Sequence, residues 1–139
     1  MKNGFITEYL STLAGKPLVY GENDCHVMVL TVIDMITGSD YRDEIYQKYN
    51  TPTAGRKYAK EHCSFPTLLG LCKEKGELVN EPLDGDIIIA SGHSTVYWRG
   101  KVVVLSEDKT KYVISYYNPD QKQKIYRFTG SNKQWQLQH

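Results

Sequence analysis

The sequence contains no long apolar run, since no stretch approaches the roughly 18 apolar residues that a membrane-spanning helix needs. The first residues, Met1 to Glu8, also lack the uninterrupted apolar region of a secretory signal. A dominant charge of one sign is missing too, because 17 Lys and Arg stand against 16 Asp and Glu, which gives a formal net charge of +1. We therefore expect no membrane span, no signal peptide and no nucleic-acid partner.

Paired cysteines are absent. The three cysteines, Cys25, Cys63 and Cys72, are odd in number and show no regular spacing, which argues against a disulfide framework and favours synthesis in a reducing compartment. Neither a Cys-x-x-Cys nor a His-x-x-x-His spacing occurs, and Gly85 lacks the glycine-rich surroundings of a phosphate loop. We expect neither a metal site nor a cofactor.

Tyrosine, in contrast, is frequent, with 11 copies against three Phe and two Trp. This composition suits strands and partly polar binding surfaces. A chain of 139 residues has room for one domain with an ordinary core. We divide it into a helical half (1–76), a sheet half (77–128) and a tail (129–139), whose single Trp135 favours docking on a partner.

The stretch from Tyr20 to Cys25 organises the chain. It is a turn rich in Gly, Asn and Asp that leads into an apolar run long enough for about three helical turns. Asn23 or Asp24 is placed to cap this helix, and Gly38 is placed to end it. Apolar residues occur on nearly every side of the run, which predicts a helix buried in the centre of the domain.

Cys25 consequently lies at a helix N-terminus. Unpaired backbone N–H groups and the positive end of the helix dipole favour a thiolate there, and a thiolate is nucleophilic. Most free cysteines are nevertheless small buried hydrophobes without chemistry. The catalytic interpretation therefore depends on a base elsewhere in the chain.

Periodicity predicts the remaining elements. Apolar spacing, Pro52 and the glycines predict helices over residues 5–13, 53–62 and 65–75, and a short surface helix within 39–53 that leans its tyrosines on the core. Cys63 and Cys72 are interpreted as core fillers of this helical part. Short β-branched or aromatic runs predict strands over 87–90, 93–98, 101–105, 112–117 and 125–128. Helices followed by a largely antiparallel sheet predict an α+β domain.

His93 is the candidate base. It follows a buried strand and a Gly-containing break, at the start of the next strand, where a side chain can project toward a packed helix. The imidazole would take the thiol proton of Cys25, the thiolate would attack a carbonyl, and backbone N–H groups at the helix start would stabilise the oxyanion. His26 points along a different helix face from the thiol, so we interpret it as a solvent-side or substrate-side residue.

Three stretches of the chain form one pattern: Tyr20-Gly21-x-x-Asp24-Cys25, Gly85-Asp86-Ile87-Ile88-Ile89 and His93-Ser94-Thr95-Val96-Tyr97-Trp98-x-Gly100-Lys101-Val102-Val103. They resemble the NlpC-type papain-like cell-wall peptidases, and especially the small phage-encoded members associated with tails, in which the cysteine helix ends in Thr-Gly as Thr37-Gly38 does here. The resemblance runs from about Tyr20 to Leu105. It implies a papain-like fold with Cys25 as nucleophile, His93 as base and Tyr20 as an oxyanion-side hydroxyl.

The chain departs from that family at two places. His26 and Val27 follow the cysteine where the family usually has Ser and a small residue. The third polar residue, which orients the imidazole, would fall near Val103 to Leu105, which are apolar. Three residues remain as alternatives through a shifted register: Ser106, Glu107 and Asn118.

Two functions follow from the resemblance. The first is a phage-encoded cysteine hydrolase that cleaves an amide bond in peptidoglycan stem peptides, with that peptide as its partner. The second is a catalytically degenerate papain-like protein that assembles with other tail or virion proteins. The departures favour the second and the retention of Cys25 and His93 favours the first, which we prefer. Either function implies synthesis in the host cytoplasm. The hydrolase is either carried by the phage or only made by it, whereas the assembly protein belongs to the virion tail. Cleavage or deamidation of a host protein would use the same pair.

Overall fold

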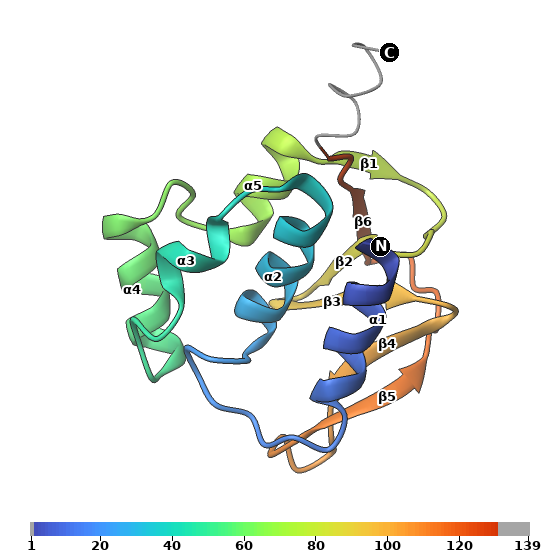
Figure 1. Ribbon diagram of the computed structural model, residues 1–139, viewed down its shortest axis with the longest axis horizontal. Coiled ribbons are helices and arrows are strands. Elements are labelled where there is room, and N and C mark those ends of the chain that lie inside the picture. Colours follow the sequence, from blue (N-terminus) through green and yellow to red (C-terminus); the bar gives the residue numbers. More distant parts are fainter. Residues whose placement is uncertain (1, 131–139) are drawn as a thin grey trace.

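The computed structural model describes residues 2–130, and in this part of the chain five helices are followed by six strands (Figure 1). The helices are α1 (Lys2–Leu13), α2 (Cys25–Thr37), α3 (Tyr41–Ile45), α4 (Pro52–His62) and α5 (Leu68–Lys75). The strands are β1 (Glu77–Val79), β2 (Ile87–Ala90), β3 (His93–Trp98), β4 (Lys101–Leu105), β5 (Tyr112–Tyr116) and β6 (Lys124–Arg127). The predicted α+β class is confirmed.

The strands form one open sheet in the order β1-β6-β2-β3-β4-β5, and every neighbouring pair is antiparallel. The hairpins β2–β3 and β3–β4 turn through Ser91-Gly92 and Arg99-Gly100, whose four φ angles are all positive. Two consecutive residues of positive φ make the tight turn that matches the twist of a β-hairpin. The predicted antiparallel character of the sheet is therefore confirmed.

Helix α2 occupies the centre of the domain. All its residues from Val27 to Ile33 are buried, as the apolar run predicts. Asp24 is the N-cap, and Gly38 ends the helix in the left-handed conformation with φ 76°. Asn23, the alternative cap, instead binds the preceding loop, where its side chain accepts a hydrogen bond from the backbone N–H of Val19.

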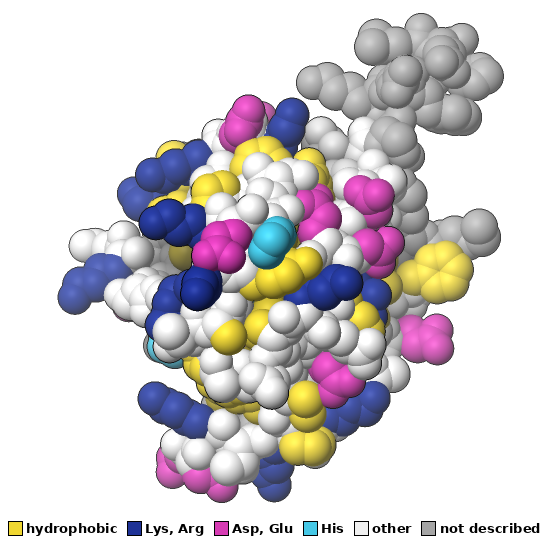
Figure 2. All heavy atoms as spheres, turned by 90° about the vertical axis from the view of Figure 1, so that its left-hand side faces the viewer, with side chains coloured by type: hydrophobic (Ala, Val, Ile, Leu, Met, Phe, Trp, Pro, Cys, Tyr) yellow, Lys and Arg dark blue, Asp and Glu magenta, His cyan; other side chains and the backbone are white. Residues whose placement is uncertain are grey.

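The helices divide into two groups around α2. Figure 1 shows α1 and α2 in front of the sheet, and α3 and α4 beyond α2 on the side away from the strands. Apolar residues of α1, α2 and the facing side of the sheet form one core cluster. Figure 2 shows the side of the molecule formed by α3 to α5, where Lys and Arg side chains are interspersed with Asp and Glu.

Local sequence signals account for most boundaries. Thr51 and Thr67 cap α4 and α5 through their hydroxyls, which accept hydrogen bonds from Ala54 N–H and Gly70 N–H. The prediction that the last helix begins at Phe65 was wrong, because the Thr67 cap delays its start to Leu68. Cys72 is fully buried and Cys63 packs partly buried against the core, which confirms both as core fillers.

Strand β1 was not predicted. Its three residues show no alternation of polar and apolar side chains and are mostly exposed. The strand exists because it pairs with β6, with Glu77 opposite Arg127. The predicted docking tail falls mostly on residues 131–139, which lie outside the described residues.

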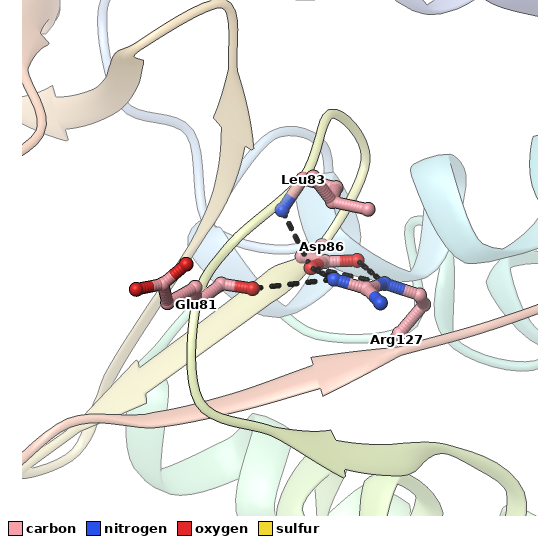
Figure 3. Close-up of polar contacts among 4 residues, drawn as sticks. All are labelled: Glu81, Leu83, Asp86 and Arg127. Carbon is pink, nitrogen blue, oxygen red and sulfur yellow. Dashed lines mark hydrogen bonds and ion pairs between the residues drawn. The ribbon is translucent and has the colours of Figure 1, made fainter.

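A buried ion pair joins the beginning of β2 to the end of β6 (Figure 3). Asp86 is 2% exposed, and its carboxylate accepts hydrogen bonds from Nε and Nη2 of Arg127. Nη2 lies 2.8 Å from Oδ2. The same carboxylate accepts a hydrogen bond from Leu83 N–H, and Arg127 also donates to the Glu81 carbonyl. Asp86 therefore ties the loop before β2 to β6.

Within residues 2–130, no helix is both long and apolar enough to cross a membrane.

Candidate active site

Cys25 is the first residue of α2. Among residues 2–130, the other N–H groups of the first helical turn form hydrogen bonds, and the N–H of Cys25 does not. Asp24 Oδ1 accepts from the N–H groups of His26 and Val27, each at 3.1 Å. Met28 N–H donates to the Asp24 carbonyl at 2.8 Å. The N–H of Cys25 makes no hydrogen bond within the described part of the chain. A carbonyl oxygen brought to the thiol would therefore find this N–H uncommitted.

The second oxygen of Asp24 is held by the turn and by a distant tyrosine. Asp24 is 6% exposed, and its Oδ2 accepts hydrogen bonds of 2.7 Å from Gly21 N–H and from the Tyr49 hydroxyl. Burial raises the pKa of Tyr49 above its usual value, with further contributions from this hydrogen bond and from the charges of Asp24 and Cys25. Tyr49 thus stays a neutral donor to the cap of α2.

Sequence reasoning missed this role of Tyr49. In the folded chain, two glycines lie against this residue. A Cβ on Gly21 would collide with the carbonyl of Tyr49, and a Cβ on Gly55 would lie 2.8 Å from the Tyr49 ring. Both glycines are needed because Tyr49 approaches them closely, a contact that only the folded chain reveals.

Two further tyrosines lie near Cys25 and differ in what their hydroxyls do. The Tyr112 hydroxyl donates to the Asn23 carbonyl at 2.6 Å, and burial raises the pKa of Tyr112, to which the charge of Cys25 also contributes. Tyr20 is 37% exposed, and its hydroxyl makes no hydrogen bond to the described residues. Since Tyr49 and Tyr112 already donate elsewhere, Tyr20 has the one uncommitted hydroxyl among these three tyrosines.

A groove of about 1040 Å³ opens at Cys25. Every residue that the sequence analysis named as a catalytic candidate lines it: Cys25, His93, Tyr20, Ser106, Glu107 and Asn118. The fold brings these residues together, because they come from segments that are far apart in the sequence: α2, the turn before it, β3 and the loops after β4 and β5.

Cys25 and His93 both line the groove. Side chains alternate along β3, and Val96 is fully buried in the core cluster that contains α2. This register assigns His93, with Thr95, to the opposite face of the sheet, and His93 is exposed at the tip of the β2–β3 hairpin. In the described part of the chain no hydrogen bond joins His93 to the Cys25 thiol.

In the described part of the chain, none of the three alternatives for an orienting residue forms a hydrogen bond with His93. The Ser106 hydroxyl donates to Asp108 Oδ1 at 2.6 Å within the β4–β5 turn. Glu107 and Asn118 are exposed, and within residues 2–130 no hydrogen bond links their side chains to His93. The third catalytic residue therefore stays an open prediction.

His26 follows Cys25 at the start of α2. It is half-buried and lines the groove beside Cys25, and burial lowers the pKa of His26, although the charge of Asp24 acts in the opposite direction. Its imidazole is consequently uncharged at neutral pH. Both sequence interpretations of His26 stay predictions.

Within residues 2–130, no group of three or more His, Cys, Asp and Glu side chains is placed to hold a metal ion.

The fold and the groove define an α+β domain whose central helix begins with a cysteine in an open groove. The chain belongs to the family described as a domain of unknown function, DUF6950, which matches residues 4–119. No curated protein and no solved structure matches the chain. The matched range contains Tyr20, Cys25, Tyr49 and His93, so the part of the groove around Cys25 lies within the family domain.

Proposed function

We propose that this chain is a cysteine hydrolase with a papain-like fold of the NlpC type, in which Cys25 attacks the carbonyl carbon of an amide bond. One observation carries the proposal: Cys25 begins α2 at the opening of the groove, with its own N–H uncommitted. A nucleophile beside a fixed backbone donor is the arrangement that acyl transfer requires.

The residues divide the reaction as follows. The His93 imidazole takes the proton from the Cys25 thiol, and the thiolate adds to the amide carbonyl. The resulting oxyanion accepts hydrogen bonds from the Cys25 N–H and the Tyr20 hydroxyl. Collapse of this intermediate releases the amine, which takes the proton back from His93, and water then hydrolyses the thioester to a carboxylic acid and the free thiol.

His93 is exposed and adjoins Ser91-Gly92, the two-residue turn at the tip of the hairpin. Contacts between a catalytic base and its nucleophile are often loose before substrate binds and tighten in the complex. We therefore assign His93 the role of base with substrate in the groove.

The resemblance to the NlpC-type peptidases supplies the substrate. On that basis we propose an amide bond in peptidoglycan stem peptides, and a phage-encoded protein made in the host cytoplasm and carried in the virion tail. These statements rest on the motifs around Cys25 and His93.

One observation favours a second function. The register that turns His93 away from the face of α2 is what a degenerate site would show. In that case the chain keeps the papain-like scaffold and acts as a structural or assembly protein of the tail. Both functions use the same fold, so only the reactivity of the thiol separates them.

The deciding experiment is alkylation of the folded protein with iodoacetamide between pH 5 and 9, followed by mass spectrometry of each cysteine. A working nucleophile makes Cys25 react at pH 6 faster than free cysteine, whose thiol pKa is about 8.5. His93→Ala should remove that advantage, and His62→Ala, which changes an exposed histidine on α4, should keep it.

Cys63 and Cys72 serve as internal references in the same digest. If Cys25 reacts only after the protein unfolds, the hydrolase proposal fails and the assembly function is left. If Cys25 is reactive, release of free amine from purified peptidoglycan, with Cys25→Ala as the blank, tests the substrate.

A further inference from the structure

Strands β3 and β4 separate partway along the sheet. Their register holds only two pairs, Tyr97 with Val102 and Trp98 with Lys101, next to the hairpin turn. Beyond these pairs the Thr95 hydroxyl, and not the backbone of β3, forms the hydrogen bonds to β4. It donates to the Val103 carbonyl at 2.6 Å and accepts from Val103 N–H at 3.2 Å. A side chain between two strands keeps their backbones farther apart than a ladder would. The sheet is therefore split between the first half of β3 and the second half of β4.

The groove that begins at Cys25 continues through this split. It is lined by Ser94 and Leu105 and also by Thr95 and Val104, which the strand alternation assigns to opposite faces. Beyond the split the groove follows the face that α1 and α2 leave uncovered. We call this part the sheet arm.

The far wall of the sheet arm comes from the connection between β5 and β6. Because β5 lies at one edge of the sheet and β6 lies between β1 and β2, residues 117–123 must cross the sheet. Tyr117 and Gln123 line the groove, and the Tyr117 hydroxyl donates to Gln123 Oε1 at 3.1 Å. The Tyr117 ring also packs edge-on against Tyr97, with centroids 5.3 Å apart. The crossing segment is thus tied down at both of its ends.

The lining of the sheet arm differs from that of the groove near Cys25. Arg56, Glu107 and Lys109 line the groove on the helix and turn side. Along β2, β4 and β5 the sheet arm is lined by side chains without charge, among them Ile88, Val102, Val104 and Ser115, and His93 lies at its end on the β2–β3 hairpin. An apolar floor beside exposed strand backbone fits an extended peptide with uncharged side chains.

We propose that the sheet arm binds an extended, uncharged peptide segment of the substrate, remote from the bond that Cys25 attacks. This inference rests on the proposed function, because it takes the groove at Cys25 as the reaction site. From Val102 to Leu105 the arm follows four residues of β4, or about 10 Å at 3.3 Å per residue, which fits about three residues of extended substrate. Binding energy from such remote contacts positions the scissile bond and raises the rate of the chemical step.

The test uses two series of alkylating peptides made only of Ala and Val. Chloromethyl ketones extend the peptide on the N-terminal side of the warhead, and N-chloroacetyl peptides extend it on the C-terminal side. In both, the Cys25 thiolate attacks the carbon that bears chlorine, a C–S bond forms and chloride leaves. Each series is made with two and with six residues, and the rate of labelling of Cys25 is measured by mass spectrometry.

We expect the six-residue reagent of one series to label Cys25 about tenfold faster than its two-residue member, the gain for burying one further aliphatic side chain. Ser115→Arg, which places a long cation in the arm, should abolish that ratio, and Asn118→Arg gives the same test at a second exposed lining residue. Ile114→Arg is the matched control, since Ile114 is 46% exposed on the neighbouring position of β5 and does not line the groove. It should leave the ratio intact.

The outcomes separate the two proposals. Equal rates for two and six residues in both series, with Cys25 still reactive toward iodoacetamide, overturn the sheet arm and leave the hydrolase standing. A ratio that survives both Ser115→Arg and Asn118→Arg also overturns the sheet arm. A Cys25 that stays inert toward iodoacetamide in the folded protein overturns both proposals.

Discussion

The Tyr49 hydroxyl donates a hydrogen bond of 2.7 Å to Asp24 Oδ2, while Oδ1 of the same carboxylate caps the helix that begins with Cys25. The segment after α3 therefore holds the turn that presents the thiol. Gln47 strengthens this link, because its N–H donates to the Gly21 carbonyl at 2.8 Å.

Removing the hydroxyl of Tyr49 tests the link. Tyr49→Phe deprives a buried carboxylate of one of its donors, and a hydrogen bond to a charged group contributes about 1.5–3 kcal/mol. We expect a loss of stability of that size in urea unfolding. Tyr58→Phe is the control, since Tyr58 makes a ring contact with His62 on α4 and should change stability by less than about 0.5 kcal/mol. Equal losses in the two variants would show that the Asp24 contact is not special.

A second prediction concerns Gly21, which lies against the backbone of Tyr49. Gly21 has φ +88° and its Cβ would collide with the Tyr49 carbonyl, whereas Gly92 has φ +80° with open space around it. Gly92→Ala suffers only the backbone strain of a positive φ, and Gly21→Ala suffers the strain and the collision. The midpoint temperature of thermal unfolding of the Gly21→Ala variant should be well below that of Gly92→Ala. Similar midpoints would mean that the segment around Tyr49 moves freely away from Gly21.

The helix that carries Cys25 was predictable because its signals are local. The cap at Asp24, the apolar run and the stop at Gly38 all lie within one stretch of sequence, and each acts on the backbone beside it. The hairpin turns at Ser91-Gly92 and Arg99-Gly100 are local in the same sense, because each consists of two adjacent residues of positive φ. The partner of Asp24 was not predictable, since Tyr49 is reached only through the packing of α3 and α4 around the turn.

The arrangement of Cys25 and His93 shows the limit of sequence reasoning. The pattern of the strand placed His93 at its start correctly, but the face on which His93 lies depends on which side of β3 meets α2, and Val96 decides that. The split between β3 and β4 was likewise hidden. Nothing in Ser94-Thr95-Val96 announces that the Thr95 hydroxyl replaces a ladder pair with Val103.

The third prediction concerns the ion pair of Figure 3. Asp86 is 2% exposed, so Arg127→Met leaves a buried carboxylate without its cation. Breaking a buried pair from one side costs about 3–5 kcal/mol, and the partial exposure of Arg127 favours the lower end. The double variant Asp86→Asn, Arg127→Met should be more stable than the sum of the two single losses predicts, as measured by urea unfolding.

An exposed pair provides the contrast. Arg42 and Asp43 lie 3.8 Å apart at the surface, and Asp43→Asn should change stability by less than about 0.5 kcal/mol. Additive losses at Asp86 and Arg127 would contradict the coupling that the hydrogen bonds between them imply.

A fourth prediction concerns selective labelling. Cys72 is fully buried, and burial raises the pKa of Cys72 to about 12. Its thiol should therefore stay unalkylated in the native protein up to pH 9 and react once urea unfolds the chain. Mass spectrometry of the peptide that contains Cys72 reports this directly. Labelling of Cys72 at native pH would mean that the helix α5 opens locally.

The last prediction is a pH dependence that His26 imposes on stability. Burial holds the pKa of folded His26 below its usual value of 6.5, so between the two values the unfolded chain binds more protons than the folded one. Stability then rises with pH across that window, and it is lost as the pH falls from 7 through 6.5 toward the folded pKa. His26→Gln removes the titration and should flatten the curve of unfolding free energy between pH 7.5 and 5.5, while His62→Gln, at an exposed site, should keep the wild-type slope. A slope that is unchanged in His26→Gln would show that another group sets the acid sensitivity of the fold.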